Sequence, residues 1–172
     1  MIKDYQQYLT TKYWAQRFAE AEMNVKENEE RRLKEPERWQ LMQDSYAAQR
    51  QNLLDEITEY EALIAHDPRE KLVLEIDDIN YLSHLVIKAR IALKLTQKEL
   101  AILSDRTEEQ IQAFEDKNYH NASFLDFLAI SNALGIKIIN GKFVAQLSDF
   151  YKQELRDIRS SVNLDDDMKA AS

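Results

Sequence analysis

The stretch that decides the fold is residues 85–101, which reads LVIKARIALKLTQKELA. Its apolar residues recur at helical spacing on both sides of a break near Lys94. Asp77 or Asp78 can cap a helix that runs to Lys94, and Thr96 can cap a second helix. Thr96 and Glu99 also have the spacing of a capping box. The stretch therefore predicts two short helices joined by a tight turn.

Two more capped helices follow. The second helix is expected to end near residues 104–105. Thr107 can cap a third helix, with Gln110 at the capping-box spacing, and Ser123 can cap a fourth that ends at Leu134. Gly135 then stands at the position where a helix commonly ends in a left-handed residue. Four short helices in about 55 residues predict a compact all-α unit.

Residues 1–66 indicate helix with a single break near Pro36. In the second of these helices, apolar residues recur every seven positions, at Trp39, Tyr46, Leu53 and Tyr60. Such a stripe suits either a helical hairpin within one chain or a coiled coil between two chains. Gln43 and Arg50 interrupt the seam, so both arrangements remain open.

Short strands are expected on either side of the four helices. Residues 71–76 alternate, with Leu72, Leu74 and Ile76 on one side. Residues 136–139 and 143–144 flank Asn140-Gly141, a pair typical of a β-hairpin turn. The predicted fold class is mainly α, with a possible small β-sheet beside the helices.

Three parts of the chain are expected. Residues 1–66 form the helical hairpin or coiled-coil arm, and residues 70–144 form the four-helix unit with its flanking strands. Residues 145–172 form a C-terminal helix, helical over 145–160, and an acidic tail that frays from about residue 165.

Composition limits the possible functions. The formal net charge is -8, whereas a protein that binds nucleic acid indiscriminately usually shows a basic footprint. The chain contains no cysteine, its three histidines are isolated, and two glycines leave little room for a phosphate-cradling loop. We therefore expect neither an enzyme nor a bound metal or cofactor.

The first residues lack the apolar run of a signal peptide, and no stretch reaches the ~20 apolar residues of a membrane span. The protein is expected to be cytoplasmic, without a membrane partner.

The four-helix region resembles the XRE family, the helix-turn-helix domains of phage repressors, Cro proteins and many bacterial regulators and antitoxins. The resemblance rests on LTQKELA at residues 95–101, on Thr107, Ile111 and Glu115, and on Ala133-Leu134-Gly135. It covers about a third of the chain. The flanking strand and the segment Gln110-Ile111-Gln112 resemble a bacterial subgroup of these regulators that has an N-terminal helical extension.

The resemblance implies that the third helix enters the DNA major groove and that Arg90 and Glu115 form a structural salt bridge. It also implies that Gln97 and the start of the second helix hold a phosphate. The expected DNA-binding residues are Gln97, Lys98, Arg106, Thr107, Glu108, Glu109, Gln110, Gln112, Lys117 and Asn118.

Two departures from the family pattern affect function. Asp105 and Arg106 occupy a turn where relatives often have glycine and a small aliphatic residue. Glu108 and Glu109 stand where base-reading residues are expected, and they would repel phosphates unless they accept hydrogen bonds from cytosine.

Two functions follow. One is a homodimeric transcriptional regulator, chiefly a repressor, that binds an operator in double-stranded DNA. The alternative is an antitoxin or adaptor whose N-terminal arm grips a partner protein, with weak or autoregulatory DNA binding.

Overall fold

The computed structural model describes residues 1–141 and 144–170, with side chains as far as Arg159. In this part of the chain, all regular structure is helical: eight α-helices and one short 3-10 helix. Met1–Ile136 form one compact unit, and the residues from Lys137 onward form a second. The prediction of a mainly α protein is confirmed.

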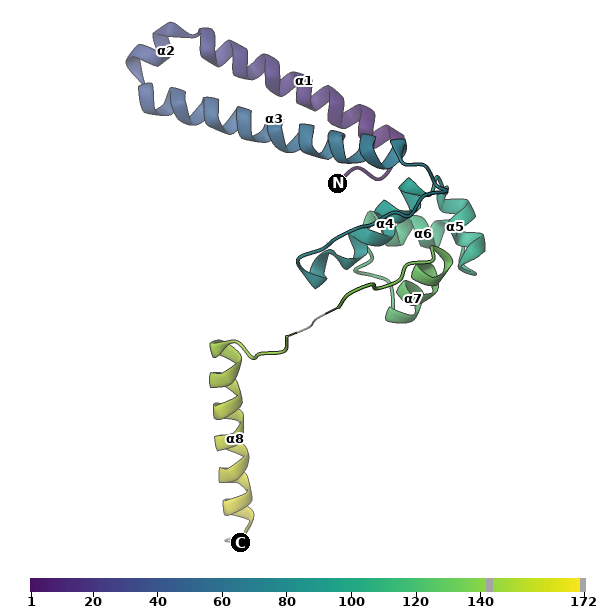
Figure 1. Ribbon diagram of the computed structural model, residues 1–172. Helices are drawn as coiled ribbons and strands as arrows, with labels where there is room; N and C mark the ends of the chain where they lie inside the picture. Colours follow the sequence, from purple (N-terminus) through teal and green to yellow (C-terminus); the bar gives the residue numbers. More distant parts are fainter. Residues whose placement is uncertain (142–143, 171–172) are drawn as a thin grey trace. The chain divides into compact units, whose positions relative to one another are not determined.

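The first three helices form a hairpin. Helix α1 (Tyr5–Glu27) runs antiparallel to α3 (Pro36–Ala65), and α2 (Glu29–Lys34) lies at the turn between them (Figure 1). The Asp4 carboxylate caps α1 by accepting from the Gln7 amide at 2.8 Å. Asn28 ends α1 and caps α2, and Pro36 occupies the first turn of α3, where its missing N–H costs nothing.

The seven-residue stripe on α3 packs against α1 of the same chain. The indole of Trp39 donates to the Val25 carbonyl at 2.7 Å, and Tyr46 and Tyr60 contact the rings of Phe18 and Tyr8. Of the two arrangements that the stripe allows, the structure shows the hairpin within one chain. The interrupting residues Gln43 and Arg50 also reach α1, where both bond to Glu22.

A helical module, residues 79–133, follows a loop. It consists of η1 (Ile79–Tyr81), α4 (Leu82–Ala92), α5 (Gln97–Leu103), α6 (Glu108–Asp116) and α7 (Phe124–Ala133). The predicted caps Thr96, Thr107 and Ser123 are confirmed, and each forms a capping box. Gly135 follows α7 with φ +66°, as its position predicts.

The helix expected from Asp78 to Lys94 differs in detail. Asp78 caps the single turn η1, α4 ends at Ala92, and Lys94 turns the chain with φ 61°.

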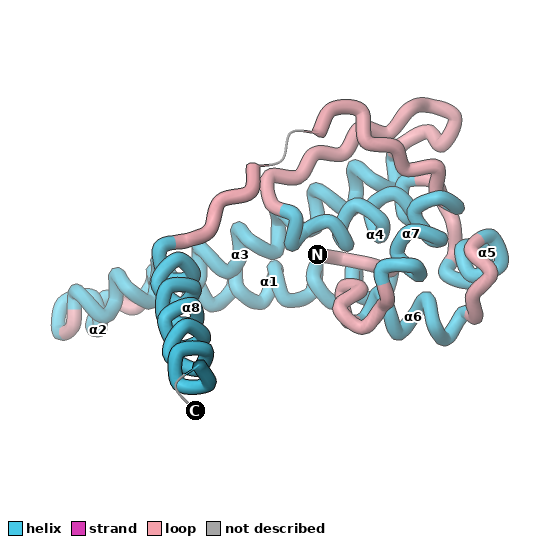
Figure 2. The backbone as a smooth tube through the Cα atoms, turned by 90° about the horizontal axis from the view of Figure 1, so that it is seen from below, coloured by secondary structure: helices cyan, strands magenta, loops and turns pink. Residues whose placement is uncertain are grey.

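The predicted flanking strands are wrong for the residues that the structure describes (Figure 2). Residues 71–76 form a loop, although Leu72 and Leu74 do pack on the core and Val73 is exposed. The alternation was therefore real, but a strand also needs a neighbouring strand to complete its hydrogen bonds. Residues 136–139 are likewise a loop, with Ile138 and Ile139 exposed, and Phe143 lies outside the described residues.

One core joins the base of the hairpin to the module. Buried residues from both parts belong to a single cluster, which includes Ile2, Ile57, Leu63, Val86, Ile87, Leu100, Ile111 and Ile130. Lysines of α4 and of the turn after it add polar links. Lys88 pairs with Glu59 of α3, and the Lys94 ammonium donates to the carbonyls of Leu63 and Ile64 at the end of α3. A cation at a helix C-terminus is favourable because the helix dipole is negative there.

The second unit carries α8 (Asp149–Ala170). The backbone of this helix begins at Asp149 and continues through the acidic residues 165–167, whereas the sequence predicts helix over residues 145–160. Fraying from residue 165 stays a prediction. None of the helices that the structure describes is both long enough and apolar enough to span a membrane.

Candidate nucleic-acid interface

Helix α6 presents a polar outer face. Ile111, Phe114 and Glu115 are buried beneath it. Its exposed side includes the predicted residues Thr107, Glu108, Glu109, Gln110 and Gln112. The structure therefore brings five of the ten predicted residues together on the first two turns of one helix.

A buried ion pair anchors α6 to α4. The Glu115 side chain is 0% exposed, and Arg90 donates to it through Nε at 2.5 Å and Nη2 at 2.8 Å. Arg90 also donates to the carbonyls of Leu95 and Lys3, each at 3.0 Å. The predicted salt bridge is confirmed. Because the pair is bidentate and further hydrogen-bonded, it sets the rotation of α6 about its axis.

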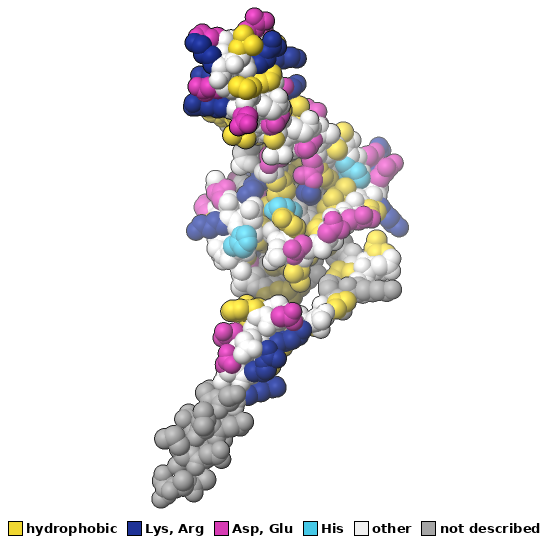
Figure 3. All heavy atoms as spheres, turned by 90° about the vertical axis from the view of Figure 1, so that its left-hand side faces the viewer, with side chains coloured by type: hydrophobic (Ala, Val, Ile, Leu, Met, Phe, Trp, Pro, Cys, Tyr) yellow, Lys and Arg dark blue, Asp and Glu magenta, His cyan; other side chains and the backbone are white. Residues whose placement is uncertain are grey.

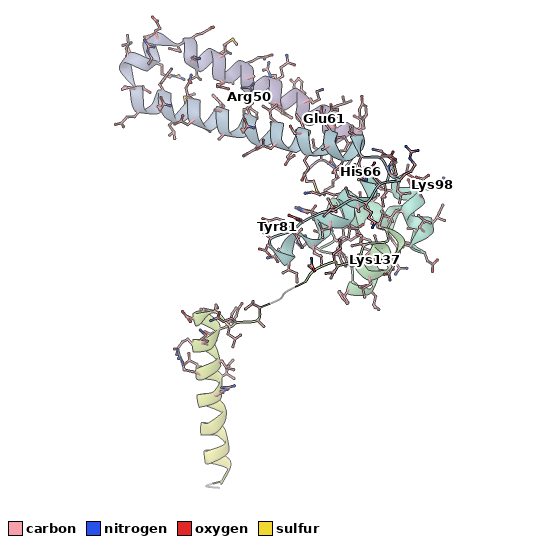
Figure 4. All side chains as sticks on the ribbon, viewed as in Figure 1. Arg50, Glu61, His66, Tyr81, Lys98 and Lys137 are labelled. Carbon is pink, nitrogen blue, oxygen red and sulfur yellow. The ribbon has the colours of Figure 1, made fainter. Side chains whose placement is uncertain are left out.

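Gln97 belongs to this buried network. Its amide Nε2 donates to Oε2 of Glu115 at 2.9 Å, and the side chain is half buried. The amide therefore faces the ion pair, and its contact with a phosphate stays a prediction. Lys98, the next residue, is exposed on α5 (Figure 4).

Sequence reasoning missed Lys3. Its ammonium donates to the Glu115 carbonyl at 2.5 Å and to the Asp116 carbonyl at 3.4 Å, at the C-terminal end of α6. The adjoining Ile2 is 2% exposed. No local sequence pattern predicts a contact between residues more than 110 positions apart, so this contact is visible only in the tertiary structure.

Arg106 is engaged within the module. Its Nε donates to Asp126 of α7 at 2.8 Å, and its Nη1 donates to the Asp105 carbonyl at 2.7 Å. Hydrogen bonds from Ser123, and then Arg106, lower the pKa of the Asp126 carboxyl. Asp105 has φ 54°, a left-handed conformation that glycine adopts without strain. The guanidinium of Arg106 therefore ties the turn before α6 to α7.

The last two predicted residues lie at the opposite end of α6. Lys117 is exposed, and Asn118 is half buried with φ 48°. An α-helix rises 1.5 Å per residue, so the ten residue steps from Thr107 to Lys117 span about 15 Å. Lys117 and Asn118 could reach a different phosphate from the one near Thr107, but they cannot join one compact site with it.

Tyr119 holds this end in place and was also missed. It has φ 59°, and its ring packs between Phe114 and Phe127. Burial raises the pKa of its hydroxyl, which therefore stays protonated. Its role is to fix the loop between α6 and α7.

The outer face of the interface is acidic. Asp105, Glu108, Glu109 and Asp116 are exposed around α6, against the exposed bases Lys98 and Lys117. Hydrogen bonds at the start of the helix, from the Glu109 amide and from Thr107, lower the pKa of Glu109, so this carboxylate is ionised at neutral pH. In the part of the chain that the structure describes, no group of three or more His, Asp or Glu side chains could hold a metal ion.

Comparison of the chain with protein-family models, with curated proteins and with solved structures gives no match in any of the three.

Proposed function

We propose that this chain is a sequence-selective DNA-binding regulator of the XRE helix-turn-helix type, which acts as a homodimer and represses by occluding a promoter. The observation that carries the proposal is the anchoring of α6. The Arg90–Glu115 pair holds this helix from beneath, and its first two turns expose polar side chains. A helix that is rigidly held and polar at its N-terminal end is what major-groove readout requires.

Gln112 is the strongest base reader. Gln110 is already committed, because its side-chain oxygen accepts from the Thr107 amide at 2.9 Å. Gln112 is exposed, and among the described residues it makes no hydrogen bond through its side chain. An amide in this position can bind adenine in a bidentate manner. Glu108 or Glu109 can accept from N4 of cytosine.

The acidic face predicts an unusual dependence on salt. Lys98 and Lys117 are the exposed bases nearest to α6, so a dimer offers about four phosphate contacts. Each contact contributes about -0.9 to the slope of log K against log salt concentration, so we expect a total slope of about -4. Selectivity then depends on base readout and on dimerisation more than on charge.

A second candidate function has its own observation. Tyr5, Leu9 and Tyr13 follow one another at four-residue steps on α1 and are 63%, 43% and 57% exposed, and the neighbouring Trp14 is 50% exposed. Exposed aromatic residues of this kind are enriched at protein interfaces. They support an antitoxin or adaptor whose hairpin binds a partner protein.

The test is a titration of the full chain against DNA from upstream of its own gene, beside an unrelated duplex. We expect Gln112→Ala to cost about 1–3 kcal/mol of discrimination at one base pair. Lys117→Ala should instead weaken binding to both duplexes about equally. Gln16→Ala, an exposed glutamine on α1, is the matched control.

Equal binding to both duplexes at low salt would overturn the regulator proposal. In that case, loss of partner binding in a Tyr13→Ser, Trp14→Ser variant would support the second candidate. Gln97→Ala is unsuitable as a first variant because it also removes a hydrogen bond from Glu115.

A further inference from the structure

Helix α8 carries a narrow apolar stripe. Tyr151, Leu155 and Ile158 are separated by four and then three residues, and the sequence continues the spacing at Val162. The stripe ends at Asp165. Tyr151 is 60% exposed and Ile158 is 56% exposed. Steps of four and three residues make the seven-residue repeat of a coiled-coil seam.

The helix gains little stability by itself. Helices in proteins take most of their stability from packing of an apolar face rather than from intrinsic propensity. The charged residues at its start bond along the same helix, as in Lys152 to Asp149 at 2.8 Å and Gln153 to Asp157 at 2.9 Å. Such pairs contribute only a little each, so the stripe is the feature that a neighbouring helix would cover.

The flanking charges identify that neighbour. With Leu155 and Ile158 in the seam, Glu154 and Arg159 occupy the two positions beside it. Glu154 directly precedes one seam residue and Arg159 directly follows the next. In a parallel coiled coil, the residue that precedes a seam position contacts the residue five positions later on the other helix. Glu154 therefore faces Arg159 of a second copy, and symmetry makes the contact twice. Both side chains are exposed, and neither forms an ion pair among the described residues.

The opposite orientation is disfavoured. In an antiparallel pair, the side of the seam that carries Lys152 and Arg159 meets the same side of the other helix. Figure 3 shows basic side chains gathered along one flank of α8. Antiparallel pairing would leave Glu154 without a cation, whereas parallel pairing sets it against Arg159 of the second copy.

We infer that α8 pairs in parallel with α8 of a second copy of this chain. This inference rests on the proposed function, which requires a homodimer, and it specifies which surface forms the dimer and how the two helices are oriented. Its test uses no DNA, so the pairing and the DNA-binding proposal can fail separately.

The experiment measures the mass of the full chain by light scattering over a range of concentrations. The wild-type chain should be dimeric, and Leu155→Asp should raise the dissociation constant about a hundredfold or more, because it places a charge in the seam. Glu154→Lys should raise it about tenfold, and adding Arg159→Glu should restore the wild-type value. Asp157→Lys makes the same change of charge on the outer side of the helix and should have little effect.

Orientation is tested by cross-linking. Because the chain contains no cysteine, Tyr151→Cys introduces the only thiol. A parallel pair brings the two introduced thiols together, and we expect a disulfide-linked dimer on mild oxidation. A monomeric wild-type chain, a dimer that survives Leu155→Asp, or a dimer whose Tyr151→Cys variant does not cross-link would each overturn the inference.

Discussion

The hairpin and the helical module are both made of helices, but different interactions hold them together. In the module, Val86, Ile87, Ala92, Leu100, Ile111 and Ile130 are all 0% exposed. The least exposed hairpin residue on α1 or α3 is Ala15, at 6%. Two helices side by side leave each seam residue open to solvent at its flanks, whereas several short helices can enclose a residue completely. A core built from several short helices therefore encloses its residues more completely than a seam between two long helices does.

The helix ends differ in the same way. Helices α5, α6 and α7 each begin with a capping box. Helix α3, the longest, begins without a side chain that accepts from its first backbone amides. Every helix leaves four amides unpaired at its start, so capping matters most where the helix is short. The three short helices α5, α6 and α7 therefore depend on single polar side chains that the long helix α3 can do without.

The first prediction compares the ion pairs of the two regions and has the largest expected effect. Glu115→Ala leaves the buried Arg90 without a counter-charge and should lower the free energy of unfolding by about 3–5 kcal/mol. Glu22→Ala removes the partner of Arg50 in the hairpin, where both side chains are partly exposed, and should cost less than about 1 kcal/mol.

Urea denaturation followed by circular dichroism measures both values. Trp14 and Trp39, the only tryptophans, lie in the hairpin, so their fluorescence reports on that region separately. If both variants lost the same free energy of unfolding, burial of the ion pair would not be what distinguishes the module from the hairpin.

The second prediction concerns the caps. Thr96→Ala removes the hydroxyl that accepts from the Glu99 amide at 3.1 Å and should cost about 1 kcal/mol. Thr96→Ser keeps the cap and serves as the control. Glu35→Ala, at the start of α3, should change the free energy of unfolding by no more than about 0.5 kcal/mol. A larger loss at Glu35 than at Thr96 in urea denaturation would contradict the contrast between the regions.

The third and smallest effect is a pH dependence that belongs to the module. Burial, and then the charge of Lys88, lower the pKa of His84, which also lies against the ring of Tyr81. The unfolded chain takes up this proton near pH 6.5, before the folded chain does. The stability that the neutral His84 provides is therefore complete above about pH 6.5 and is lost as the pH falls through the folded pKa.

His84→Gln should flatten the dependence of unfolding free energy on pH between about pH 7 and pH 5. His120→Gln, at an exposed position, is the control. An unchanged slope in the His84 variant would show that another group causes any loss of stability in this range.

Much of the module could be predicted because its signals are local. The hydroxyls of Thr96, Thr107 and Ser123 each accept a hydrogen bond from the backbone amide three positions later. The positive φ of Gly135 is a property of that residue's own backbone. Such features depend on a few neighbouring residues, so they can be predicted without knowledge of the tertiary structure. The surroundings of the residues predicted to bind DNA do not follow from local signals, since Arg106 and Gln97 bond to residues 20 and 18 positions away.

The sequence by itself determined the helical periodicity, the caps, the turn at Gly135 and the seven-residue stripe on α3. Only the tertiary structure decided which surfaces those elements meet. It placed the stripe against α1 of the same chain and brought Lys3 to the end of α6. It also left Leu72 and Leu74 packed on the core in a segment that has no neighbouring strand among the described residues. The physical reason is range. Caps and periodicity are set within a few residues, whereas a seam, a sheet or a buried ion pair exists only when distant segments meet and exclude water together.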